Sequence, residues 1–127
     1  MPFKKSIRTF RWLSLIALLS SACGGKELEL KDFDHHRWQE DKHACESVRT
    51  TLVSTLMDQR DDILAHNEME IVELLGKPDE SELYKRNQKF YYYYVEPGPK
   101  CKSEITSPKK LVIRFNAMGL AKEMQIE

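Results

Sequence analysis

The spacing of the apolar positions predicts two helices in the first half of the folded part of the chain. Between residues 34 and 60 the apolar side chains recur three, four or seven positions apart, as on one face of an amphipathic helix. They are Trp38, Cys45, Val48, Leu52 and Leu56. End signals bound a second helix: Asn67 with Glu70 matches a capping box, and Gly76 with Pro78 would terminate it.

After Pro78 the pattern changes to one typical of strands. Strands are expected at residues 88–95, 111–115 and 120–126, with residues 80–85 as a candidate short edge strand. Residues 116–119 form a tight turn between the last two strands, in which Gly119 takes a positive φ. The sequence therefore predicts an α+β fold, with two N-terminal helices packed on one face of a three- or four-stranded antiparallel sheet.

The first 23 residues have the pattern of an export signal. Four basic residues precede an apolar run of about 11 residues, which ends in small residues and Cys23. The run is shorter than the roughly 20 residues that cross a bilayer as a helix. The segment Leu19-Ser20-Ser21-Ala22-Cys23 resembles the lipobox of bacterial lipoproteins. This resemblance implies that residues 1–22 are removed and that Cys23 is lipidated; the alternative is an ordinary signal peptide cleaved after Ala22.

The lipoprotein resemblance sets the expected domain organisation and location. Residues 23–33 are expected to form the lipidated cysteine and a tether, and residues 34–127 a single domain. The signal carries four of the 20 basic residues and no acidic one, so 16 basic residues remain against 20 acidic ones. This balance argues against a nucleic-acid partner and leaves the lipid as the membrane attachment. Gly24, in place of the Asp that retains enterobacterial lipoproteins in the inner membrane, implies an outer-membrane location facing the periplasm.

Two cysteines remain after Cys23 is set aside. Cys45 and Cys101 are expected to form a disulfide, because the compartment outside the cytoplasm favours oxidation. Two buried, unpaired cysteines are the alternative. A metal site built on them is disfavoured, since no CxxC spacing is present.

The search for chemically active residues yields one candidate metal set. His36, Glu40 and His43 would share one face of a continuous helix. Histidines on a solvated surface are the favoured interpretation, because no further ligand is evident in the sequence. No catalytic residue, metal, cofactor or small-molecule substrate is predicted.

The aromatic segment Phe90-Tyr91-Tyr92-Tyr93-Tyr94 is the candidate working surface. Strand alternation places Phe90, Tyr92 and Tyr94 on one face of the sheet, and Tyr91 and Tyr93 on the other. Helices on one side of the sheet leave one row exposed, and tyrosine is enriched at interfaces. We assign Tyr91 and Tyr93 as the candidate partner-binding pair. The alternative is that these tyrosines only favour the strand.

Three segments together resemble the SmpA/OmlA-type lipoprotein domain, the fold of a small accessory lipoprotein of the outer-membrane β-barrel assembly machinery. They are residues 67–79, with the sequence Leu-Leu-Gly-Lys-Pro near their end, residues 91–94 and residues 111–119. The resemblance implies a non-enzymatic envelope lipoprotein that binds or positions other envelope proteins during outer-membrane assembly or maintenance. Because fold alone does not give function, an inhibitor or ligand-binding module that uses the exposed sheet face is the alternative.

Overall fold

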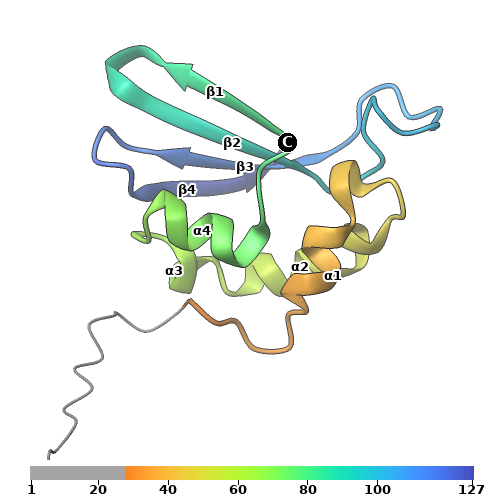
Figure 1. Ribbon diagram of the computed structural model, residues 1–127, viewed down its shortest axis with the longest axis horizontal. Coiled ribbons are helices and arrows are strands. Elements are labelled where there is room, and N and C mark those ends of the chain that lie inside the picture. Colours follow the sequence, from red (N-terminus) through yellow and green to blue (C-terminus); the bar gives the residue numbers. More distant parts are fainter. Residues whose placement is uncertain (1–27) are drawn as a thin grey trace, which may run out of the picture.

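The α-helices precede a four-stranded antiparallel sheet in the computed structural model, which describes residues 28–127 (Figure 1). The predicted α+β class is confirmed. The helices are α1 (His35–Glu40), η1 (Lys42–Ala44), α2 (Val48–Asp58), α3 (Arg60–Ile63), α4 (Glu68–Leu75) and η2 (Lys85–Asn87). The strands are β1 (Glu80–Tyr84), β2 (Gln88–Tyr94), β3 (Lys110–Phe115) and β4 (Ala121–Ile126).

The sheet follows the chain order, β1-β2-β3-β4, and every neighbouring pair is antiparallel. Its inner face packs on the helices, which lie on one side of the sheet in Figure 1. Tyr91, Ile113 and Met124 lie side by side across the inner face, whereas Tyr92, Val112 and Gln125 lie side by side across the opposite, outer face. The core between sheet and helices includes Trp38, Leu56, Ile63, Ile71, Leu75, Tyr93, Leu111, Ile113 and Phe115.

The prediction of a single helix over residues 34–60 is wrong, because this segment divides into α1, η1, α2 and α3. His43, Ala44 and Ser47 adopt positive φ values of 59°, 57° and 57°, which a right-handed helix does not allow. The Asp41 carboxylate accepts hydrogen bonds from the backbone N–H groups of Glu46 and Arg49, at 2.8 and 3.0 Å. These side-chain bonds satisfy donors around the start of α2 and favour the break over a continuous helix.

The second predicted helix is confirmed as α4, with the end signals read from the sequence. Asn67 accepts a hydrogen bond from the Glu70 backbone N–H at 2.9 Å, and the Glu70 side chain completes the capping box. Gly76 ends the helix at φ 79°, a value that favours glycine. Gln39 of α1 donates to the carbonyls of Glu73 and Leu74, at 2.9 and 3.1 Å, and so ties the end of α4 to α1.

The folded part begins before the boundary expected from the sequence. Phe33 is buried in the core, and Leu28 and Leu30 pack against it. The predicted tether of residues 23–33 therefore contributes its last residues to the domain. The predicted signal peptide and Cys23 lie outside the described residues. From residue 28 onward, no helix has both the length and the apolar character needed to cross a bilayer.

Candidate binding surface

The two tyrosines expected to be exposed lie on the inner face. Tyr93 is completely buried, and its hydroxyl donates to the Gly76 carbonyl at 2.8 Å. Tyr91 is half-buried, and its ring contacts the Phe115 ring with 4.8 Å between centroids. The predicted alternation along β2 is correct, but the assignment of Tyr91 and Tyr93 as the exposed pair is wrong. The helices cover the face to which these residues point.

The opposite row of β2 instead forms an aromatic strip on the outer face. The rings of Phe90 and Tyr92 stack at 6.4 Å, and Tyr84 of β1 meets Phe90 edge-on at 6.1 Å. Tyr84 is 58% exposed, and Phe90 and Tyr92 are half-buried. We call Tyr84, Phe90 and Tyr92 the aromatic strip. Within the described residues, no helix packs over it.

Charged side chains of both signs surround the strip. The Tyr92 hydroxyl donates to Glu82 and the Tyr94 hydroxyl to Glu80, each at 2.8 Å. The Lys110 ammonium lies 4.4 Å from the centre of the Tyr92 ring, within the range of a cation–π interaction. Protein-binding surfaces are enriched in aromatic residues and have a polar rim, and the strip with its neighbours has both features.

The environment of the outer face raises the pKa values of its phenols. The pKa of Tyr92 and the pKa of Tyr94 are each raised to about 12, first by desolvation and then by the hydrogen bond to the neighbouring glutamate. Each hydroxyl donates to its carboxylate partner, which holds the hydroxyl in a fixed direction. This hydrogen bond at Tyr92, together with the ring contacts of Phe90, positions the aromatic strip before any partner binds.

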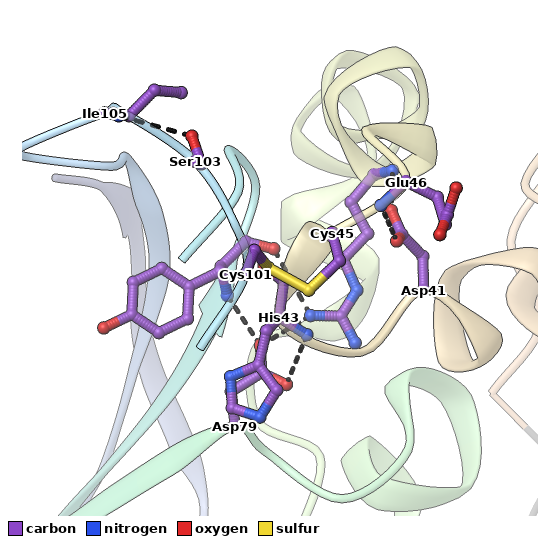
Figure 2. The surroundings of a disulfide bond; sticks show 10 residues. Asp41, His43, Cys45, Glu46, Asp79, Cys101, Ser103 and Ile105 are labelled. Carbon is purple, nitrogen blue, oxygen red and sulfur yellow. Dashed lines mark hydrogen bonds and ion pairs between the residues drawn. A yellow bond between two sulfur atoms is a disulfide. The ribbon is translucent and has the colours of Figure 1, made fainter. Parts of the chain in front are cut away.

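A disulfide fixes one end of the outer face (Figure 2). Cys45 and Cys101 are bonded and bring the loop between β2 and β3 against the segment that follows α1. The Gly98 N–H donates to the His43 carbonyl at 2.9 Å. A Cβ at Gly98 would lie 2.9 Å from the Tyr94 ring, so the loop approaches that ring as only glycine allows. The loop covers Tyr94, and this leaves the aromatic strip as the open part of β2.

A buried ion pair next to the disulfide was not predicted from the sequence. Arg49 Nη1 lies 2.6 Å from Asp79 Oδ2, and the two side chains are 1% and 3% exposed. Asp79 also accepts from the backbone N–H groups of His43 and Tyr94, at 3.1 and 2.8 Å. One signal was present, because Arg49 lies four residues after Cys45 and three before Leu52, on the apolar face of the predicted helix. The pair joins α2 to the start of β1.

The candidate metal set is not assembled. His36 and Glu40 are on α1, but His43 follows the break, at φ 59°, and its ring lies 6.1 Å from that of Tyr94. Within residues 28–127, no three His, Cys, Asp or Glu side chains are grouped as metal ligands would be. The spacing argument fails here because it assumed a continuous helix.

Comparison with known proteins gives no match: no family model matches the chain, and neither a curated protein nor a solved structure is significantly similar to it. The functional argument therefore depends on the residues and the surface described above.

Proposed function

We propose that this chain is a non-enzymatic lipoprotein of the cell envelope that binds other envelope proteins through the aromatic strip. Its lipid on Cys23 anchors it, with the folded domain facing the periplasm, in the outer membrane. The resemblance to SmpA/OmlA domains supports a role in outer-membrane assembly or maintenance.

The observation that carries the binding proposal is the contiguous row of exposed Tyr84 and half-buried Phe90 and Tyr92, with charged neighbours. Tyrosine offers a large apolar contact area at low cost in conformational entropy, and its hydroxyl fixes orientation. An enzyme would need reactive groups converging on a cleft, whereas this strip lies on an open sheet face. Binding is the activity that such a face supports best.

The anchoring part of the proposal predicts the effect of Cys23→Ala. We expect the wild-type chain to incorporate labelled palmitate and to fractionate with the outer membrane. The variant should lose the label and remain in its uncleaved form. Equal labelling of the two chains, or wild-type protein recovered free in the periplasm, would contradict lipidation at this residue.

The binding part predicts the effect of Tyr84→Ser on partner recovery from gently solubilised membranes. Tyr84 is 58% exposed, so the substitution removes contact surface with little loss of core packing. We expect loss of a co-purifying envelope protein that the wild type retains. Ser54→Tyr, at an exposed position of α2, is the control and should retain it. Recovery of a soluble enzyme whose activity falls on binding would support the inhibitor alternative instead.

A further inference from the structure

Among residues 28–127, the edge of the sheet at β4 is paired at its start, whereas the outer edge of β1 is unpaired along its whole length. At β4, the backbone of Ala121 exchanges hydrogen bonds with Ala65 and His66, at 2.8 and 2.9 Å, and Leu120 forms a bridge with Asn67. Strand β1 pairs only with β2, and all five of its residues are exposed. Among residues 28–127, no segment pairs with the outer edge of β1. Backbone N–H and C=O groups on such an edge can form hydrogen bonds with another extended chain.

An apolar groove lies on the inner side of the sheet, between α4 and Tyr91 of β2, the residue that pairs with Ser81 of β1. It has a volume of about 330 Å³ and is lined by Glu68, Met69, Val72, Glu73 and Tyr91. Met69 of α4 is 74% exposed, and Leu83, which also points to the inner side, is 72% exposed. Large apolar side chains this exposed, next to an unpaired strand, are an unusual combination in a soluble domain.

The charges of β1 indicate what kind of extended segment can pair with its edge. Glu80 and Glu82 point to the outer face, and Ser81 and Leu83 to the inner face. A second copy that paired along all of β1 would bring Glu82 directly opposite its counterpart, which is unfavourable. An added strand can match both faces of the sheet. Its basic residues would pair with Glu80 and Glu82 on the outer face, and its apolar residues would contact the groove on the inner face.

We propose that the outer edge of β1, with the groove between α4 and Tyr91 on the inner side, binds an extended segment of a partner protein, in which basic and apolar residues alternate, as a fifth strand of the sheet. The backbone ladder supplies affinity that is independent of side chains, and the alternation supplies specificity. This site adjoins the aromatic strip, because Tyr84 is the last residue of β1 and Glu82 accepts from the Tyr92 hydroxyl. Its failure is distinguishable from failure of the proposed function, because it is tested by protection of the β1 backbone and by Met69, which is not part of the strip.

The test uses the full-length protein in neutral detergent micelles and a blocked seven-residue peptide of alternating lysine and valine. Binding is measured by fluorescence anisotropy, and amide hydrogen exchange locates it. We expect slowed exchange in residues 80–84 on binding. A glutamate–valine peptide and a peptide with a central proline should bind at least about tenfold more weakly, because the first meets like charges and the second breaks the ladder.

A double variant, and a single variant with a matched control, sharpen the test. Glu80→Gln with Glu82→Gln keeps acceptors for the two tyrosine hydroxyls but removes the charges, and should weaken binding by about two- to thirtyfold. Met69→Ser should weaken it about tenfold, whereas Met118→Ser, at the 81% exposed methionine of the β3–β4 turn, should leave it unchanged.

Three results would overturn the proposal. The first is that the lysine–valine peptide does not bind. The second is that it binds without added protection of residues 80–84. The third is that protection of those residues depends on the protein concentration and not on the peptide. The last of these would assign the edge to a second copy of this chain.

Discussion

At the scale of single residues, the buried pair Arg49–Asp79 shows what sequence patterns convey only weakly. The guanidinium lies over the Trp38 and Tyr93 rings, 5.1 and 5.9 Å from their centres, and donates to the Trp38 carbonyl at 2.9 Å. Asp79 follows Pro78 in a segment that the sequence marks only as a helix end. A pair contributed by residues 30 positions apart depends on the tertiary fold, so periodicity alone does not predict it.

Substitution of Asp79 by Ala should be strongly destabilising. It leaves the Arg49 charge buried without its partner, which costs about 3–5 kcal/mol in the free energy of unfolding. Urea denaturation followed by circular dichroism measures this loss. Glu123→Ala, which removes the partner of Arg114 in an exposed pair, is the control and should cost at most about 1 kcal/mol. Equal losses in the two variants would contradict the role assigned to the buried pair.

At the scale of elements, the sequence predicted well wherever local signals decide the structure. The capping box and Gly76 determine α4, and the alternation along β2 separates its two rows. The prediction of the first helix failed because the Asp41 side chain and three positive-φ residues interrupt an otherwise helical spacing. The exposed row was assigned to the wrong side because alternation separates two faces without indicating which one the helices cover.

Strand β2 should give the protein a distinct alkaline transition. The pKa of Tyr92 and the pKa of Tyr94 are each raised to about 12 in the folded state, from 10.0, and burial raises that of Tyr93 as well. The unfolded chain loses these protons first, so the stability is complete below about pH 10 and falls as the pH rises towards 12.

Absorbance at 295 nm, which reports phenolate, should therefore show that most of the five tyrosines of the folded protein ionise well above pH 10. In 6 M guanidinium chloride all of them should titrate together near pH 10. Tyr92→Phe should remove one of the late ionisations. Coincident titration curves for the folded and unfolded protein would contradict the buried and hydrogen-bonded environment of β2.

At the scale of the whole molecule, one disulfide joins the helical and sheet parts. Cys45 and Cys101 are 56 positions apart, and their bond holds the loop between β2 and β3 beside the α1–α2 junction. The same loop covers Tyr94 and so defines where the aromatic strip begins. The disulfide thus contributes both to the stability of the fold and to the shape of the proposed binding surface.

Removal of the disulfide should destabilise the domain substantially. In the chain-entropy view, the double substitution of Cys45 and Cys101 by Ser costs about 4 kcal/mol in the free energy of unfolding. Thermal unfolding of the full-length protein measures the loss. Cys23→Ser, which removes the cysteine outside the described residues, should leave the unfolding temperature unchanged. A double variant as stable as the wild type would show that the bond does not hold the loop in solution.

The most direct test of the proposed function is photocrosslinking in intact cells from the aromatic strip. A photoreactive amino acid is placed at Tyr84 or Tyr92, and at Ser54 of α2 as the control, and the adducts are identified by mass spectrometry after membrane fractionation. We predict that both strip positions capture the same outer-membrane assembly or maintenance protein and that position 54 does not. No adduct from the strip, or the same adducts from position 54, would contradict the proposal that this surface binds an envelope partner.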